Sequence, residues 1–340
     1  MSPKHFTALG VAALASSAAA MAVFMSATPW PASGQRHEAL LPELRSESAK
    51  VAAIEIGRGA DKLALTLQDG RWVVSSAGGY PADTQAVRKL VVSTSEADLV
   101  ERKTAKRDLH KLLGVADGDA GGSARTIRFL DDKAAVAGEI LVGNTRADAP
   151  GTSAGGTYVR RPGSDQVWLA NRTLDASTSL RDWAKTKLVD LPAESIETVS
   201  INVTGESAPL SIVREADKKS HKLTEIPPGK KLKYVNSIDD VVEAISLIEF
   251  KGVRKAGFGT LPPKSGQATL KTESGLTATV DYFSDDKEAW VTITPSGDGQ
   301  AKAAADDIAL RTKGWEFEVP LAEISATLKK RGELLEDTSS

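Results

Sequence analysis

Alternating hydrophobic and polar positions fill two stretches of the chain, residues 51–170 and 196–319. A period of two puts every second side chain on the same face of a β-sheet, so each such run predicts a half-buried strand. The runs are VAAIEI (51–56), LALTL (63–67), GRWVV (70–74), RTIRFL (125–130), AGEILVGN (137–144), TYVRR (157–161) and QVWLA (166–170), then IETVSI (196–201), LSIV (210–213), HKLTEI (221–226), ATLKT (268–272), TATVDYF (277–283), AWVTI (289–293) and WEFEV (315–319).

A helical period replaces the alternation once within each stretch. In residues 80–99 Asp83 is the expected N-cap, and in residues 236–250 Ser237 with Asp240 three positions later resembles an acidic capping box. Each segment has apolar residues on one face only, which predicts an amphipathic helix packed on a sheet. The apolar faces consist of Ala86, Val87, Leu90 and Val91, and of Ile238, Val241, Val242, Ile245 and Ile248.

A closing helix is expected after the last strand of each stretch. Its inward-facing residues are predicted to be Leu180 with Leu188 in the first stretch. In the second stretch they are predicted to be Leu328 with Leu335. Trp168 and Trp315 lie on the strands that precede these helices, and we expect each ring to pack against its helix.

The two stretches repeat the same order of strands and helix, with the second copy matching the first more loosely in places, which predicts an internal duplication. Val51 and Ile196, which open them, are 145 residues apart, and Trp168 and Trp315 are 147 apart. Strands, then a helix, then strands predict an α+β fold with two tandem copies of a mostly antiparallel sheet and packed helices, preceded by one N-terminal hydrophobic helix. The expected division is 1–45 for the N-terminal segment and linker, 46–192 for the first repeat domain and 193–340 for the second, with Leu191–Ser195 as the link.

The N-terminal segment contains twenty residues without a charge, Phe6–Met25. A helix of that length spans about 30 Å, the thickness of a bilayer's hydrocarbon core. We expect an uncleaved inner-membrane anchor with the rest of the chain in the bacterial periplasm. The alternative is a signal peptide that is cleaved to leave a periplasmic protein, because the segment is rich in Ala and Ser and poor in Leu.

Composition narrows the function classes. The 340 residues are enough for two domains, and 41% hydrophobic with 26% charged residues is typical of a globular protein. A net charge of −2 provides no basic field, so nucleic acid is not an expected partner. The absence of cysteine excludes disulfides, thiolate metal sites and cysteine nucleophiles.

Residues with chemistry of their own form no recognisable catalytic motif. The histidines, His5, His37, His110 and His221, have no metal-ligand spacing, and we interpret His110 as a solvated helix residue and His221 as part of a Lys-rich turn. The acidic pairs 131–132, 285–286 and 306–307 are assigned to turns, and Asp239–Asp240 to the first turn of a helix. No catalytic, cofactor-binding or metal-binding residue is therefore predicted, and no cofactor.

Two basic clusters, residues 101–111 and 218–233, are interpreted as charged helix ends and hairpin tips. The alternative is contact with anionic lipid head groups or a partner. The tryptophans at 72, 168, 290 and 315 are expected on strands.

The N-terminal hydrophobic segment, GRWVV at 70–74, YPADTQAVRKLV at 80–91 and LLGV at 112–115 together resemble the bacterial domain-of-unknown-function family numbered 4340. The resemblance is closest over residues 51–192, and the second copy, 196–337, lacks the Gly-x-Trp hairpin and the Tyr-Pro helix start. Members of that family are often encoded beside a transport system similar to the gliding-motility type of ABC exporter. The resemblance implies an accessory role at the membrane and supplies no catalytic residue.

Two functional hypotheses follow. The first is a non-enzymatic, membrane-anchored periplasmic accessory protein of an ABC-type transport complex, with the permease or an extracytoplasmic subunit as partner. The second is a periplasmic module that binds a glycan, lipid or peptide in the cleft between the repeats. An exported hydrolase would need catalytic groups that converge from distant positions.

Overall fold

The computed structural model describes residues 38–117, 122–148, 155–216 and 220–338. Over these residues the chain is a mixed α+β protein with mostly antiparallel sheets and few helices, which confirms the predicted fold class at that level. The hydrophobic segment Phe6–Met25 lies outside the described residues. Among the residues that are described, no helix is long and apolar enough to cross a membrane.

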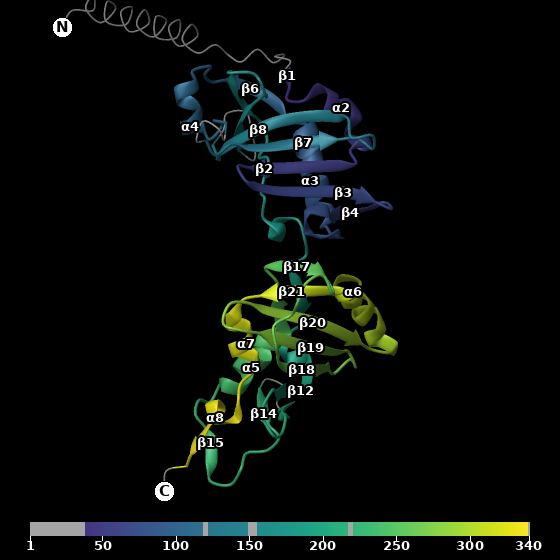
Figure 1. Cartoon of the computed structure of the whole chain (residues 1–340), viewed down its shortest axis with the longest axis vertical. Helices are drawn as coiled ribbons and strands as arrows, with labels where there is room; N and C mark the ends of the chain where they lie inside the picture. The colour runs from purple at the N-terminus through teal and green to yellow at the C-terminus, as the bar shows by residue number, and fades with distance from the viewer. Residues whose placement is uncertain (1–37, 118–121, 149–154, 217–219, 339–340) are drawn as a thin grey trace, which may run out of the picture.

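The first large sheet has ten strands. Helices α2 (Pro42–Glu47) and α3 (Thr84–Ser95) belong to this half of the chain, as does the short α4 (His110–Leu113). Figure 1 shows α3 behind the strands, so one face of the sheet is covered by it and the other faces the viewer. In spatial order the strands are β1 (Glu38–Ala39), β6 (Asp98–Arg102), β10 (Val167–Ala170), β9 (Gly156–Arg160), β8 (Val136–Arg146), β7 (Arg125–Leu130), β2 (Ala53–Arg58), β3 (Asp61–Gln68), β4 (Arg71–Val74) and β5 (Tyr80–Pro81).

The alternation predicted from the sequence creates the core of this half. Ile54 pairs with Leu65, and Ile56 pairs with Leu63, so these four side chains point to the helix-covered face and are buried. Helix α3 begins at the predicted cap, because Asp83 accepts a hydrogen bond from the backbone N–H of Gln85. The predicted apolar face of α3 is confirmed, with Val87 and Leu90 buried and Ala86 and Val91 packed against the same core.

The second large sheet has eight strands. Its helices are α5 (Ser237–Ser246), α6 (Lys302–Thr312), α7 (Leu321–Thr327) and α8 (Arg331–Leu334). Four of the five residues of the predicted α5 face are buried on the helix itself, and Ile248 is buried on the strand that follows. In spatial order the strands are β14 (His221–Leu223), β13 (Leu210–Arg214), β12 (Ile196–Val203), β18 (Lys264–Thr272), β19 (Thr277–Ser284), β20 (Ala289–Ser296), β21 (Trp315–Val319) and β17 (Gly252–Lys255).

Two small sheets complete the second half. β11 (Lys187–Asp190) pairs with β16 (Leu247–Glu249), and β15 (Lys230–Leu232) pairs with β22 (Leu335–Asp337). β11 therefore lies with the second half of the chain, although its residues precede the Leu191–Ser195 link. Short 3-10 turns occupy Ser48–Lys50, Ser75–Ala77, Arg107–Leu109, Leu180–Asp182, Ala193–Ser195 and Gly299–Ala301.

The two large sheets share one succession of strands. The first runs β6-β10-β9-β8-β7-β2-β3-β4, with β1 and β5 added at its edges, and the second runs β17-β21-β20-β19-β18-β12-β13-β14. β6 and β17 each come after the first long helix of their half, and each lies beside the last strand of its sheet. Trp168 on β10 pairs with Arg102 of β6, and Trp315 on β21 pairs with Lys255 of β17.

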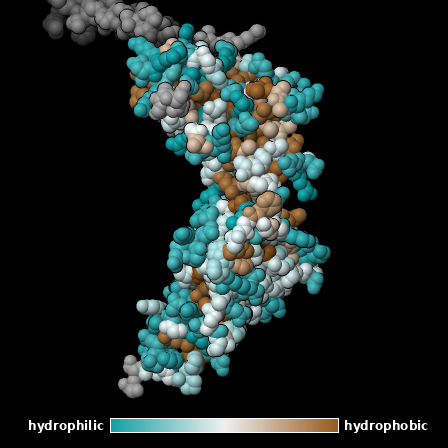
Figure 2. Space-filling view, viewed as in Figure 1, coloured by the Kyte–Doolittle hydropathy of each residue, from teal (hydrophilic) through white to brown (hydrophobic). Residues whose placement is uncertain are grey.

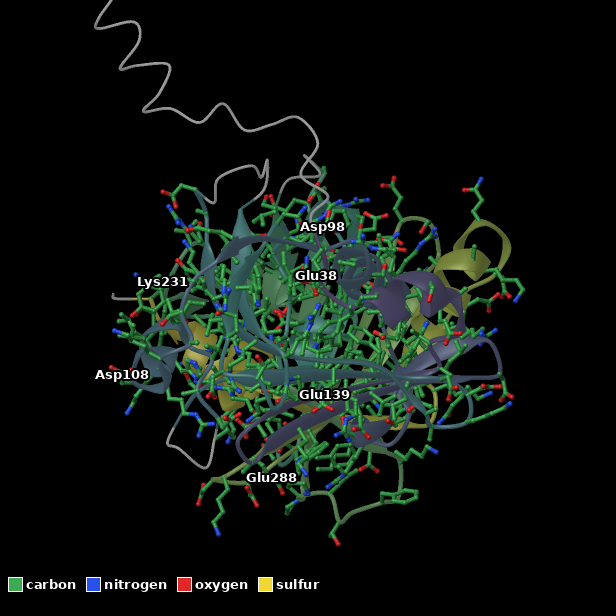
Figure 3. The ribbon with its side chains drawn as sticks, turned by 90° about the horizontal axis from the view of Figure 1, so that it is seen from above. Glu38, Asp98, Asp108, Glu139, Lys231 and Glu288 are labelled. Atoms are coloured by element: carbon green, nitrogen blue, oxygen red, sulfur yellow. The ribbon has the colours of Figure 1, made fainter. Side chains whose placement is uncertain are left out.

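Tyr80 joins the two halves. It belongs to the first sheet, yet it packs in the core of the second half and is 1% exposed. Its ring makes edge contacts with Phe250, Trp315 and Phe317, at centroid distances of 5.4, 5.1 and 5.9 Å. Figure 2 shows the molecule narrowing between the two halves, with hydrophobic residues at the waist. Seen along the long axis in Figure 3, charged side chains such as Asp108, Lys231 and Glu288 lie at the periphery.

The predicted closing helix of the first half is wrong. Leu180 lies in a single 3-10 turn and Leu188 lies on β11, because the chain extends here to pair with β16. In the second half two short helices, α7 and α8, replace the predicted one, and Leu335 lies on β22.

Two further local predictions need correction. Ser237 is not a side-chain cap of α5, since its hydroxyl donates to the Tyr234 carbonyl and the N-cap residue is Asn236. Asp306 and Asp307 are in helix α6 rather than in a turn, where Lys302 and Arg311 pair with them one helical turn away.

Candidate functional site

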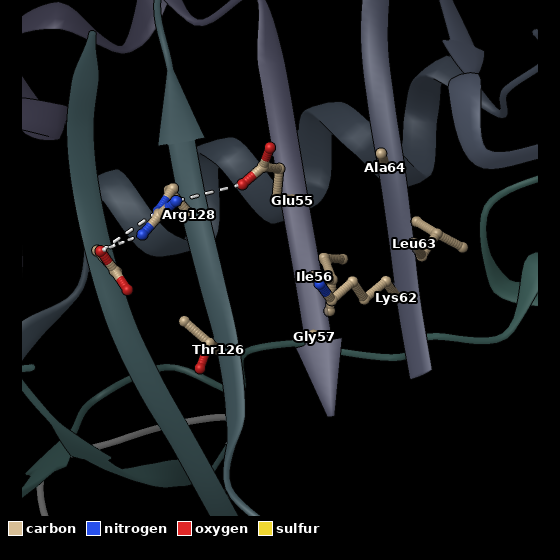
Figure 4. A pocket seen from close by; sticks show the side chains of 9 residues that line it. Glu55, Ile56, Gly57, Lys62, Leu63, Ala64, Thr126 and Arg128 are labelled. Carbon is tan, nitrogen blue, oxygen red and sulfur yellow. Dashed lines mark hydrogen bonds and ion pairs between the residues drawn. The ribbon is translucent and has the colours of Figure 1, made fainter. Parts of the chain in front are cut away.

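A shallow depression of about 310 Å³ lies on the face of the first sheet opposite its core. Its floor is Gly57, and its rim includes Glu55, Lys62, Thr126 and Arg128 (Figure 4). These residues point outward because they alternate with the buried Ile56 on β2, Leu63 on β3 and Ile127 on β7. The depression is thus a direct product of the strand register.

A charged row crosses the rim. Glu55 of β2 pairs with Arg128 of β7, and Arg128 pairs with Glu139 of β8. The Arg128 guanidinium nitrogens lie 3.5 Å from Glu55 Oε2 and 3.3 Å from Glu139 Oε2. Since the three side chains are 27–55% exposed, each ion pair contributes only about 0–1 kcal/mol to stability. Because these ion pairs are weak, the three side chains can break them at little cost and bind a ligand instead.

Gly57 makes the depression hollow. A glycine inside a strand destabilises it by roughly 0.5–1 kcal/mol relative to Ala, and in folded proteins it often marks a close approach by a ligand or another backbone. A Cβ built at Gly57 meets no atom within 4 Å, so nothing in the described part of the fold requires glycine here. The lining residues include Glu55, Lys62 and Arg128, whose charged groups can bind a polar ligand through charge-assisted hydrogen bonds.

Replacing Gly57 with Thr should stabilise the protein by roughly 0.5–1 kcal/mol, because Thr favours extended backbone and finds open space. The same change fills the floor of the depression. Thermal unfolding measures the gain. A control is Gly266→Ala on β18, where a Cβ would lie 2.6 Å from the Asn202 carbonyl oxygen and should destabilise the protein. Loss of stability in Gly57→Thr would show that the space is not free.

The histidines do not form a site together. His110 is buried, contrary to its interpretation as a solvated residue, because α4 folds onto the loop before β10. The Nε2 atom of His110 lies 2.8 Å from the Asp165 carbonyl oxygen. His221 lies on β14 rather than in a turn, with Nδ1 3.0 Å from Asp239 and Nε2 3.1 Å from the Ile196 carbonyl. These contacts give both rings structural roles. His5 and His37 lie outside the described residues.

The remaining acidic pairs follow the prediction. Asp131 and Asp285 accept hydrogen bonds from backbone N–H groups of the turns that follow them. The backbone N–H groups of Lys287 and Glu288 lower the pKa of Asp285 below its usual range. Asp239 and Asp240 occupy the first turn of α5. In the part of the chain that the structure describes, no group of three or more His, Cys, Asp and Glu side chains is placed to hold a metal ion.

Several residues of the basic clusters form ion pairs with acidic side chains, and the four tryptophans lie on strands. In the first cluster Arg107 pairs with Asp165, and in the second Lys230 and Lys231 pair with Asp337 and Glu336. The tryptophans at 72, 168, 290 and 315 lie on strands, as predicted. Trp290 is stacked beneath Arg254, whose guanidinium carbon is 3.9 Å from the ring centroid.

Glu323 on α7, away from the depression, has a carboxyl group that is largely removed from solvent. Its Oε1 is buried and has no hydrogen-bond partner among the described residues. Burial raises its pKa to about 7, against a smaller lowering by the neighbouring Thr327 hydroxyl. The nearby Tyr282 hydroxyl is buried as well, and burial raises its pKa above the ordinary range.

The raised pKa of Glu323 predicts a protein that loses stability as pH rises. Between pH 4.5, the ordinary pKa of a Glu side chain, and about pH 7, the folded protein keeps this proton whereas the unfolded chain releases it. The free energy of unfolding therefore falls as the pH rises through this range, and it stays lower at higher pH. Melting temperatures at pH 5 and pH 8 measure the effect. Glu323→Gln, which is neutral throughout, should reduce this difference. An equal difference in the variant would contradict the assignment.

The sequence contains one signal for the depression, because Gly57 directly follows the alternating run VAAIEI at an outward-facing strand position. Glu55, Arg128 and Glu139 give no local signal, because they are far apart in sequence and meet only through the pairing of β2, β7 and β8.

A family model described as Domain of unknown function (DUF4340) matches residues 72–276 of the chain. The matched range begins on β4 and ends after β18, so it includes parts of both large sheets. No curated protein and no solved structure matches the chain.

Proposed function

The chain belongs to the DUF4340 family, and from this premise we propose that it is a non-enzymatic, extracytoplasmic accessory protein of an ABC-type transport complex. In this proposal residues 6–25 hold it in the bacterial inner membrane as a single-pass protein, and the rest of the chain lies in the periplasm. The charge-free stretch Phe6–Met25 is the observation that carries it.

The architecture supports a scaffold more than an enzyme. The shared succession of strands suits two tandem copies of one unit, 46–192 and 193–340, preceded by a hydrophobic helix. Tyr80 fixes the copies to each other end to end, and each sheet keeps one face free of its own core. Of these faces, the charged face of the first sheet is the one that we assign to a protein partner, namely the permease or an extracytoplasmic subunit of the transporter.

The experiment combines topology with partner capture. A C-terminal alkaline phosphatase fusion to the full chain should be active in a bacterial host, and the same fusion lacking residues 6–25 should be inactive. Cross-linking in the native host followed by mass spectrometry should then recover subunits of an ABC transporter. Activity of a cytoplasmic reporter at the C-terminus would overturn the topology, and recovery of no transport subunit would overturn the accessory role.

A second candidate function is binding of a polar peptide beside the junction of the two halves. A recess of about 520 Å³ is lined by Lys185, Lys187, Glu249, Asp307 and Arg311 among others, which favours a charged peptide over a lipid. A hydrogen bond from Thr186 and the charge of Arg181 lower the pKa of Glu249. Panning a peptide library on the full chain tests this function, with Glu249→Gln as the variant that should lose the selected peptides.

A further inference from the structure

A row of hydroxyl side chains crosses the face of the second sheet that points away from its core. The row is continuous over five adjacent strands, because each member is the cross-strand partner of the next. All of its members are at least partly exposed. With strands about 4.8 Å apart, the row spans about 19 Å. Its members, in order, are Ser211, Ser200, Thr269, Thr279 and Thr294.

The surroundings of this hydroxyl row are polar with little unpaired charge. The next row on the same face consists of Asn202, Gln267, Asp281 and Thr292. Its one carboxylate is neutralised, since Asp281 lies 2.5 Å from the Lys264 ammonium and accepts a hydrogen bond of 2.8 Å from Gln267. Phe283 follows on the same face of β19 and is half-buried. The face is therefore flat and rich in hydrogen-bonding groups, with an aromatic ring at its margin.

The fold does not require hydroxyls at these positions. Ile201, Ala268 and Val280 on the second sheet correspond to Ile56, Ile127 and Ile140 on the first, as three consecutive inward partners. By the same register, Ser200, Thr269 and Thr279 correspond to Glu55, Arg128 and Glu139. One set of positions thus carries hydroxyls in the second half and charges in the first.

Strand propensity does not account for the row either. Thr is a good strand former, but Ser is not among the residues enriched in strands. Ser200 and Ser211 nevertheless face each other directly in the row. Within the row Thr269 and Thr279 share one hydrogen bond, with their Oγ1 atoms 3.2 Å apart. Each hydroxyl offers both a donor and an acceptor, so capacity for further hydrogen bonds remains.

We propose that the hydroxyl row is a binding surface for a neutral polysaccharide strand. Sugar hydroxyls are donors and acceptors of the same kind, and an uncharged polymer matches a face whose charges are already paired. The length of the row accommodates several sugar rings side by side, and the half-buried Phe283 lies to one side of the row, four residues beyond Thr279 on β19. The two lysines beside the row already have carboxylate neighbours, because Lys264 pairs with Asp281 and Lys271 lies 4.0 Å from Glu197, so an anionic polymer would compete with these carboxylates. This proposal goes beyond the accessory role and does not depend on the transporter.

Co-sedimentation of the detergent-solubilised full chain with insoluble cellulose and with chitin tests the proposal. The wild-type chain should sediment with at least one of them. The double variant Thr269→Val and Thr279→Val removes two hydroxyls while keeping the β-branched shape, so its melting temperature should stay close to that of the wild type and its apparent Kd should rise at least tenfold. Thr66→Val on the outward face of β3 in the first sheet removes a hydroxyl outside the row and is the matched control, and its binding should not change.

Three results would overturn the proposal. The first is no sedimentation of the wild-type chain with either polymer. The second is equal binding by the wild-type and the Thr→Val variant. The third is preferential binding to an anionic polysaccharide such as alginate, which would assign the interaction to charged groups elsewhere on the surface.

Discussion

Replacing Tyr80 with Ala should lower the free energy of unfolding by about 3–5 kcal/mol, the range for truncation of a large buried aromatic side chain. Tyr80 is among the largest fully buried side chains, and its ring contacts Phe250, Trp315 and Phe317 of the other half. The cavity would open between the two halves rather than inside one of them. Calorimetry should therefore show one cooperative transition in the wild-type chain and two separated transitions in the variant.

Tyr80→Phe is the matched control. The Tyr80 hydroxyl is buried and has no hydrogen-bond partner in the described part of the chain. Burial raises its pKa above the ordinary range, although the charge of Arg311 acts in the opposite direction. An unsatisfied buried hydroxyl costs about 1–3 kcal/mol, so removing it should leave stability unchanged or increase it. A clear loss of stability in Tyr80→Phe would mean that the hydroxyl has a partner, and a single unchanged transition in Tyr80→Ala would mean that the halves are coupled elsewhere.

The sequence predicted most strands of the fold because the period of two is strong where one face of a sheet is buried. It failed where a strand is short or follows a helix directly. The segment 80–99 in which a helix was predicted overlaps the start of β6, and neither β6 nor β17 was predicted as a strand. Both lie beside the last strand of their sheet, and this long-range pairing stabilises an extended segment that local pattern does not reveal.

Helix α6 was missed for a different reason. Its sequence KAAADDIALRT buries only Ala305, Ile308 and Thr312, so its apolar face is too narrow to produce a strong helical period. The predicted closing helix of the first half shows the opposite error. Helical spacing of Leu180 and Leu188 was overridden when β11 found a partner in β16. In both segments tertiary contacts decided the structure.

The polar faces of the sheets were only partly predictable. Alternation alone identifies which residues point outward, and Glu55, Arg128 and Thr269 satisfy it. Which outward residues become neighbours depends on the pairing of β2 with β7 and of β12 with β18. These strands are more than 60 residues apart in the chain, and no local signal fixes their register. The charged row and the hydroxyl row therefore required the structure.

Trp315→Ala should cost about 3–5 kcal/mol, and Trp168→Ala about half as much. The two residues occupy corresponding positions, each on the last strand of its sheet and opposite a basic residue of the neighbouring strand, Arg102 of β6 or Lys255 of β17. Neither ring packs against the closing helix that the sequence predicted. The surroundings of the two rings also differ from each other. Trp315 lies edge-on to Tyr80 at 5.1 Å and packs on the second core, whereas Trp168 packs on the first core beneath Arg102, 6.0 Å from its ring.

Chemical denaturation of the two variants and of Trp315→Phe measures the difference. Trp315→Phe retains an aromatic edge for Tyr80 and should recover most of the loss. If the loss in Trp315→Ala arises from the contact with Tyr80, combining it with Tyr80→Ala should cost clearly less than the sum of the two single losses, since both variants remove the same interaction. If the loss in the double variant equals the sum of the two single losses, Trp315 stabilises the protein through contacts within its own half. Equal losses in Trp315→Ala and Trp168→Ala would mean that the duplicated position has one role in both halves, and that Tyr80 alone joins them.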